Sequence, residues 1–271
     1  MKLLKVMASA ALVLTLAASA SADKSKIVME GSTTVLPIAQ AAAEAYMDKN
    51  ADVNITVRGG GSGVGISSLM DSTCDIGNSS RPIKGSEIAG ALVKGVDPKA
   101  NVIAMDGIVV IVNPANGVSA LSKKQVKQIY TGEINDWSKV GGTPGKIVVV
   151  SRDTSSGTYE AFGTLALEGA KVRPDALLQA SNQAVATTVA QTANGIGYIG
   201  LGYVTSSVKA LTLNGVDCSK ATVLNASYPY SRPLFMYTNG KPQGEIKKFI
   251  GWLLSADGQK LVEAQGFVPL K

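Results

Sequence analysis

The chain has 271 residues, a formal net charge of +6 and no histidine. Without histidine it lacks the usual general base, the usual member of a catalytic triad and the commonest metal ligand. Its basic residues are scattered rather than clustered, so nucleic acid is not an expected partner. The length suits one large domain or two of ordinary size.

The N-terminus has the composition of a secretion signal. Two lysines precede an apolar stretch at residues 6–16, and small residues at 20–22 precede Asp23. We therefore predict a signal peptide over residues 1–22. No cysteine stands at this junction, so a lipid anchor is not expected. No other stretch reaches the ~18 apolar residues that a membrane span needs. Together with the predicted signal peptide, this indicates that the mature chain is exported.

Two strand-turn-helix units open the mature chain. A strand at residues 26–30 precedes the turn 31–34 (Gly-Ser-Thr-Thr) and a helix that runs to about Lys49. An alternating strand at 53–58 precedes the glycine-rich turn 59–63 and a short helix at 64–70. The glycine turn lacks the lysine of a P-loop, and taken alone it is best explained as a tight connection.

Strands and polar turns alternate through the middle of the chain. Residues 74–82 form a short buried strand with a polar loop, in which Arg81 is either a ligand or a solvated charge. The apolar runs 102–105 and 108–112, separated by Asp106-Gly107, are compatible with one long strand that passes between two lobes. A helix at 122–130 is expected to begin with Ser122 as its cap.

The stretch from Ser151 to Thr158 organises the chemistry of the chain. It follows an apolar strand at 147–150 and precedes a helix that begins near Tyr159. The unpaired N–H groups of that helix N-terminus, the fork of donors on Arg152 and several hydroxyls can together hold a tetrahedral oxyanion. An ordinary N-cap and surface turn uses the same residue types, so this stretch alone leaves both interpretations open.

The rest of the chain continues the alternation of strands and helices, which indicates an α/β fold. Cys74 and Cys218 lie far apart in sequence, and either a disulfide bond or two buried thiols is compatible with an oxidising compartment. The remaining predicted elements are a helix at 184–193, strands at 195–200 and 231–237, and helices at 243–254 and 256–264.

Several segments, taken in their order, resemble the phosphate-binding protein of the high-affinity phosphate ABC transporter, the PstS family. The resemblance covers nearly the whole mature chain, and the joint order of the segments is more specific than any one of them. The segments are Gly31 to Thr34, Gly59 to Gly63, Asp75 to Arg81, Ile129 to Trp137, Arg152 to Thr158, Gly195 to Tyr198 and Tyr228 to Pro233.

This resemblance implies a two-lobed periplasmic-binding-protein fold of type II, with a ligand cleft between lobes that are joined by two crossings. We expect one lobe to comprise residues 24–106 and 231–271, and the other residues 107–230. The resemblance also implies a periplasmic monomer without a cofactor. Its ligand would be inorganic phosphate and its partner a membrane ABC permease.

The same resemblance implies which residues bind phosphate. Hydroxyl and backbone groups would come from both lobes, with Arg152 as the main charge partner and Asp153 as the residue that positions it. No catalytic residue and no metal ligand is expected. The expected ligand set is Thr33, Thr34, Ser62, Ser80, Arg81, Arg152, Ser156, Gly157 and Thr158.

Ser80 departs from the pattern of many family members, which carry an aspartate at this position. In those members the carboxylate accepts a hydrogen bond from the protonated oxygen of phosphate, and it rejects sulfate, which has no proton to offer. Because this chain has a serine there, the sequence leaves open how it would discriminate phosphate from sulfate. Sulfate and molybdate are the nearest alternative ligands. A secreted phosphohydrolase that uses Ser62 or Ser156 is a further alternative, disfavoured because the chain has no histidine to act as base.

Overall fold

The computed structural model describes residues 25–270, so the predicted signal peptide lies outside the described residues. The strands are β1 (Ser25–Gly31), β2 (Val53–Gly59), β3 (Ile76–Ser79), β4 (Pro98–Val112), β5 (Ala120–Leu121), β6 (Val148–Arg152), β7 (Leu177–Gln179), β8 (Gly195–Gly200), β9 (Lys209–Ala210), β10 (Thr212–Leu213) and β11 (Ser231–Asn239). The helices are α1 (Leu36–Met47), α2 (Ser62–Met70), α3 (Gly85–Val93), α4 (Lys123–Thr131), α5 (Gly157–Leu165), α6 (Asn182–Gln191), α7 (Lys220–Leu224), α8 (Gly244–Leu253) and α9 (Ala256–Ala264), with short 3₁₀ helices η1 (Trp137–Val140) and η2 (Leu201–Tyr203).

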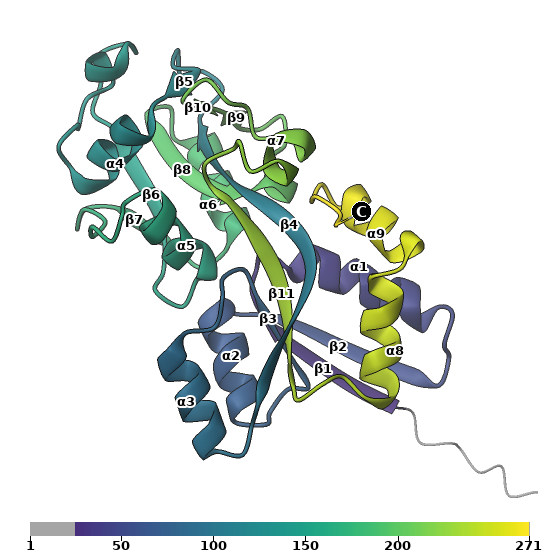
Figure 1. The fold of residues 1–271 in the computed structure, drawn as a ribbon. Coiled ribbons are helices and arrows are strands. Elements are labelled where there is room, and N and C mark those ends of the chain that lie inside the picture. Colours follow the sequence, from purple (N-terminus) through teal and green to yellow (C-terminus); the bar gives the residue numbers. More distant parts are fainter. Residues whose placement is uncertain (1–24, 271) are drawn as a thin grey trace, which may run out of the picture.

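A mixed β-sheet runs through the molecule (Figure 1). Its strand order is β2-β1-β3-β11-β4-β8-β6-β7, with β9 beside β4, and β5 and β10 form a separate pair. β1 is parallel to β2 and β3, and β6 is parallel to β7 and β8. β11 and β4 are antiparallel to each other and to their neighbours β3 and β8. Two parallel units therefore flank a central antiparallel pair.

The central strands β4 and β11 connect two hydrophobic cores. β4 is continuous from residue 98 to 112, which confirms that the two apolar runs form one strand. Ile103 belongs to a core with β1 and α1, whereas Ile108 belongs to a core with α4 and α5. The fold is thus two-lobed: the first lobe is built on β1–β3, and the second lobe on β6–β8. The residue boundaries predicted for these lobes stay a prediction.

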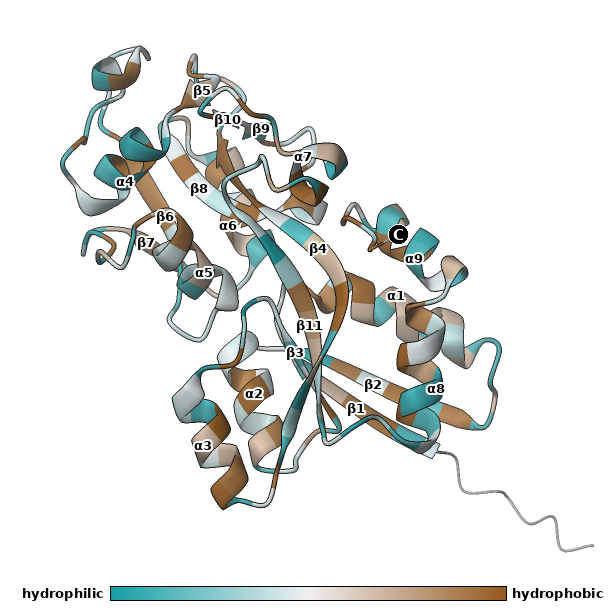
Figure 2. Ribbon diagram, in the orientation of Figure 1, coloured by the Kyte–Doolittle hydropathy of each residue, from teal (hydrophilic) through white to brown (hydrophobic). Residues whose placement is uncertain are grey.

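Helices cover both faces of the sheet in each lobe. In the first lobe, α1, α8 and α9 pack around Met29 on one face, and α2 and α3 pack around Leu69 on the other. In the second lobe, α4 and α5 pack around Phe162, and α6 supplies Val185 to the opposite face. Strands covered on both faces need near-continuous apolar sequences, and Figure 2 shows such stretches along β1, β4 and β6.

Most elements lie where the sequence predicts them, and the exceptions are short or weakly patterned. The helix predicted at 122–130 is α4, and Ser122 Oγ accepts from the Gln125 N–H at 3.1 Å. The helix α3 was not predicted, because it lacks a buried apolar face that would show as a period in the sequence. Ala91 is the only buried residue of this helix, and its apolar residues Leu92 and Val93 are exposed. Strands of two or three residues, such as β5, β7, β9 and β10, are too short to show a period.

The described residues contain two free cysteines and no candidate metal cluster. Cys74 is buried and Cys218 is half-buried. Of the two alternatives that the sequence left open, a disulfide bond or two thiols, the structure has the two thiols. Burial raises the pKa of the Cys74 thiol to about 12. Between residues 25 and 270, no group of three or more cysteine or acidic residues could hold a metal ion. Over the same range, no helix is both long and apolar enough to span a membrane.

Candidate functional site

Four polar turns meet at the carboxyl ends of strands. They follow β1, β2, β3 and β6, and in sheets with parallel strands this edge is the usual position of a ligand site. Each turn supplies hydroxyl groups that are buried although the sequence around them is polar. These buried residues are Thr33, Thr34, Ser62, Ser80, Ser156 and Thr158.

The glycine turn after β2 places Ser62 at the beginning of α2. Gly61 has φ of 103°, which glycine adopts without strain, and its N–H donates to Gly31 O at 2.9 Å. Ser62 Oγ accepts from the Ser80 N–H at 3.0 Å and lies 3.4 Å from Ser80 Oγ. Two serines from separate turns are therefore adjacent at one helix N-terminus.

The N-terminus of α5 faces that of α2. Ser156 caps α5, since its Oγ accepts from the Tyr159 N–H at 3.2 Å. A Cβ built on Gly157, the first residue of α5, would lie 2.2 Å from Ser62 Oγ and 2.9 Å from Ser80 Oγ. The unpaired N–H groups and partial positive charges of two helices thus converge, which favours an anion between them.

Hydrogen bonds join the two turns directly across the lobes. The Gly63 N–H donates to Ser155 O at 2.9 Å, and Ser155 Oγ donates to Gly60 O at 3.1 Å. Because these residues belong to different lobes, the structure represents a closed arrangement.

Arg152 is a buried arginine at the end of β6. Its Nε donates to Gln179 O and its Nη2 to Ala180 O, each at 3.0 Å. The Asp153 carboxylate lies 3.8 Å from Nη2, so the two carbonyls position the guanidinium more closely than the expected Asp153 does. Within the part of the chain that the structure describes, Arg152 Nη1 is buried without a partner. Burial lowers the pKa of Arg152, and an anionic oxygen would satisfy the free N–H groups.

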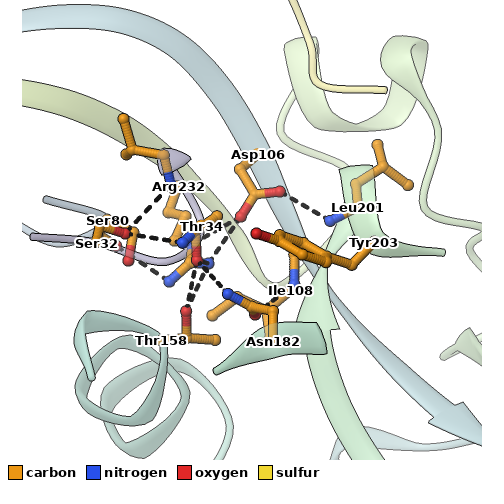
Figure 3. Close-up of polar contacts among 12 residues, drawn as sticks. Ser32, Thr34, Ser80, Asp106, Ile108, Thr158, Asn182, Leu201, Tyr203 and Arg232 are labelled. Carbon is orange, nitrogen blue, oxygen red and sulfur yellow. Dashed lines mark hydrogen bonds and ion pairs between the residues drawn. The ribbon is translucent and has the colours of Figure 1, made fainter. Parts of the chain in front are cut away.

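A second buried arginine, Arg232, links both lobes at the strand crossing. It lies opposite Asp106 in the sheet, and its Nε and Nη2 donate to Asp106 Oδ2 at 2.9 and 2.8 Å. Its Nη1 donates to Ser80 O at 3.1 Å, and Nη2 reaches Thr158 Oγ1 at 3.0 Å and Thr34 Oγ1 at 3.3 Å (Figure 3). Burial raises the pKa of Asp106 and lowers that of Arg232, in opposition to their mutual attraction.

Asn182, the first residue of α6, completes the cluster (Figure 3). Its Oδ1 accepts from the Gly200 N–H at 3.1 Å. Its Nδ2 donates to Thr34 Oγ1 at 3.0 Å and to Thr33 Oγ1 at 3.2 Å. The hydroxyls of Thr34 and Thr158 are 2.9 Å apart, so threonines from the two lobes are in direct contact.

Arg81 is a predicted ligand, but in the structure its guanidinium pairs with acidic side chains. Its Nη1 and Nη2 donate to Glu87 at 2.8 and 2.7 Å, and its Nε lies 3.0 Å from Glu160 Oε1. Lys84 Nζ lies 2.6 Å from the other oxygen of Glu160. Two carboxylates therefore compensate the charge of Arg81. The group borders an interlobe cavity of about 430 Å³ lined by Ser80, Arg81, Pro82, Lys84, Glu160, Ala161, Thr164, Leu165, Ser231, Arg232 and Pro233.

The sequence interpretation missed three residues of the cluster: Asp106, Asn182 and Arg232. A signal existed for two of them, because a charged residue inside an apolar strand is buried only with a partner. Asp106 interrupts the apolar run of β4, and Arg232 stands in β11 shortly before the apolar run Leu234 to Tyr237. No comparable signal marks Asn182, which follows an ordinary serine cap.

Comparison with known proteins shows the family. The family model of the PBP superfamily domain matches residues 17–257. The phosphate-binding protein PstS of Bacillus subtilis (strain 168) is 36% identical over 249 residues, which cover 90% of this chain and 80% of that protein. A crystal structure from Clostridium perfringens with bound phosphate is 35% identical, with a TM-score of 0.85 over 91% of this chain and 100% of that chain. An ABC-type phosphate transport receptor from Vibrio cholerae is 33% identical, with a TM-score of 0.74 over 89% of this chain and 99% of that chain. This chain therefore belongs to the PstS family of the PBP superfamily.

Proposed function

We propose that this chain is an exported, periplasmic receptor that captures inorganic phosphate between its lobes and delivers it to an ABC permease. The observation that carries the proposal is the meeting of the α2 and α5 N-termini around buried hydroxyls. Fixed N–H and hydroxyl donors of this kind bind a tetrahedral oxyanion without a metal or cofactor. Relatives that are named as phosphate-binding protein and phosphate transport receptor support phosphate as the anion.

The proposed ligands come from both lobes, taken as residues 24–106 with 231–271 and residues 107–230. Arg152 supplies the charge through its Nη1, which has no partner among residues 25–270. Arg81 is the weakest member of the predicted set, because Glu87 and Glu160 already compensate it. The other proposed ligands are Thr33, Thr34, Ser62, Ser80, Ser156, Gly157 and Thr158.

Calorimetric titration of ligand-stripped protein with phosphate, sulfate and molybdate tests this function. We expect one site per chain and the highest affinity for phosphate. A preference for sulfate or molybdate would overturn the assignment of the ligand.

The site has the composition of a receptor rather than of a hydrolase. Ser62 Oγ meets the N–H and hydroxyl of Ser80, and Ser156 Oγ accepts from a helix N–H. Neither serine has a base among these partners, and a serine nucleophile needs one within hydrogen-bond reach. A chromogenic phosphate ester should therefore not be turned over. Turnover that Ser62→Ala or Ser156→Ala abolished would contradict a purely binding role.

Ser80→Asp should widen the preference for phosphate over sulfate. Ser80 can donate as well as accept, whereas a carboxylate accepts only, and it would face an unprotonated oxygen of sulfate. An unmet buried polar group costs roughly 1–3 kcal/mol, so the ratio of the two affinities should rise by roughly tenfold. Competition titration at fixed pH measures this ratio. Ser67→Asp, at an exposed position of α2, adds the same charge and should leave the ratio unchanged. An unchanged ratio in Ser80→Asp would show that Ser80 does not face the proton of phosphate.

Gly157→Ala should weaken phosphate binding by preventing full closure. The new Cβ would enter the space of Ser62 Oγ in the other lobe, and such overpacking costs about 1–3 kcal/mol, which is roughly 5- to 150-fold in affinity. The open form avoids the clash, so thermal stability without phosphate should be retained. Titration measures the affinity, and small-angle scattering should show a smaller decrease in the radius of gyration with phosphate than in the wild type.

Gly163→Ala is the matched control for this prediction. It lies in the same helix, and a Cβ on Gly163 would meet no atom of the described residues within 4 Å. Equal affinities for Gly157→Ala, Gly163→Ala and the wild type would contradict the proposed contact between the lobes on ligand binding.

A further inference from the structure

The hydroxyl of Thr34 has both of its acceptor positions occupied (Figure 3). A hydroxyl carries one donor and two acceptor lone pairs. Thr34 Oγ1 lies 3.0 Å from Asn182 Nδ2 and 3.3 Å from Arg232 Nη2. An amide nitrogen and a guanidinium nitrogen can only donate. The remaining function of the Thr34 hydroxyl is therefore to donate its own proton.

The orientation of the Asn182 amide follows from its other partner. Asn182 is fully buried, and its Oδ1 accepts from the backbone N–H of Gly200 at 3.1 Å. If the amide were turned over, its NH₂ group would face this N–H, donor against donor. The Gly200 N–H therefore requires Nδ2 to face Thr33 and Thr34.

Arg232 extends the same constraint to the second lobe. Asp106 fixes its guanidinium through two hydrogen bonds, and its Nη2 donates to Thr158 Oγ1 at 3.0 Å. Thr158 Oγ1 thus accepts from Arg232, and Thr34 is its neighbour at 2.9 Å. Because both acceptor positions of Thr34 are occupied, the hydrogen bond between the two threonines runs from Thr34 to Thr158. Thr158 then accepts from Arg232 and from Thr34, which leaves the proton of Thr158 for a group between the lobes.

We infer that Asn182 and Arg232 are positioning residues that fix the direction of the hydrogen bond from Thr34 to Thr158 and so hold Thr158 as a hydrogen-bond donor toward the anion. This inference rests on the proposed function, because it takes Thr158 as a ligand of phosphate. A hydroxyl that can only donate recognises an unprotonated oxygen. The protonated oxygen of phosphate must then face another part of the site, such as the turn that contains Ser80, so recognition of charge and recognition of the proton are separated in space.

Asn182→Asp tests the inference by replacing a donor with an acceptor. The Thr34 hydroxyl would turn its proton to the new carboxylate and accept from Thr158, and Thr158 would then present a lone pair to the ligand, which only a protonated oxygen can satisfy. Relative to the wild type, we expect this variant to lose about tenfold more phosphate affinity at about pH 8 than at about pH 6. Asn182→Ala removes the donor without adding an acceptor, and it should weaken binding by a similar factor at both pH values.

Thr34→Val separates this effect from simple repulsion between the new carboxylate and the more highly charged form of phosphate. In the double variant Asn182→Asp/Thr34→Val, the extra pH dependence should disappear, because without the Thr34 hydroxyl the new carboxylate has no link to Thr158. Its persistence in the double variant, or its absence in Asn182→Asp, would overturn the inference. An unchanged affinity in Asn182→Ala would also overturn it, even if Asn182→Asp did not fold.

The wild type in the same titration series distinguishes this inference from the function on which it rests. Failure of the wild type to bind phosphate would overturn the proposed function and the inference with it. A wild type that binds phosphate, together with variants that share its pH dependence, would overturn the inference alone.

Discussion

Asp106→Ala is expected to lower the free energy of unfolding by about 3–5 kcal/mol. Asp106 is fully buried and receives two hydrogen bonds from Arg232 and one from the Leu201 N–H at 2.9 Å. Its removal leaves a buried guanidinium without its counter-charge, which costs more than the pair itself contributes. The loss is concentrated where β4 and β11 cross, so both lobes should be affected.

Urea unfolding at neutral pH without phosphate measures this loss. Asp175→Ala is the control, because Asp175 also pairs with an arginine, Arg173, but is largely exposed and should contribute far less. A similar change in both variants would show that the buried pair does not stabilise the crossing.

Arg152→Met is expected to weaken phosphate binding by at least roughly tenfold, because charge-assisted hydrogen bonds are worth about 1.5–3 kcal/mol each. Methionine keeps much of the apolar stem of arginine and removes the guanidinium. Arg152 Nη1 has no partner within residues 25–270, so its hydrogen-bonding capacity is available to a ligand. The carbonyls of Gln179 and Ala180 also lose their donor, and unfolding curves should therefore accompany the titration.

Arg58→Met removes the same charge from an exposed position on β2 and serves as the matched control. Calorimetric titration of both variants should show a large loss of affinity for Arg152→Met and a small one for Arg58→Met. Equal losses would indicate that overall charge, rather than a contact by Arg152, governs phosphate binding.

Local patterns were sufficient to predict the turns that carry the candidate ligands. A strand, a turn of small or hydroxyl residues and a helix N-terminus can be recognised within about ten residues, because period and capping are local properties. This predicted the turns at Thr34, Ser62 and Ser156, and the continuous strand β4. The order of the turns along the chain indicated the family, which no single motif did.

The positions of Arg81 and Arg232 could not be derived in this way. Both arginines stand between a serine and a proline, so their immediate neighbours in the sequence do not distinguish them. Their roles depend on partners that lie 6 and 126 positions away, Glu87 and Asp106. Only the antiparallel register of β11 on β4 places Arg232 opposite Asp106, and long-range register is not a local property of the sequence.

The central claim is that the anion lies between the N-termini of α2 and α5. The most direct measurement is a crystal structure of ligand-stripped protein grown with arsenate, a tetrahedral analogue whose arsenic atom is located by anomalous scattering. The account predicts a single arsenic site within hydrogen-bond reach of Arg152 Nη1, Ser62 and Thr158. An arsenic site elsewhere on the protein, with this position occupied by water alone, would contradict it.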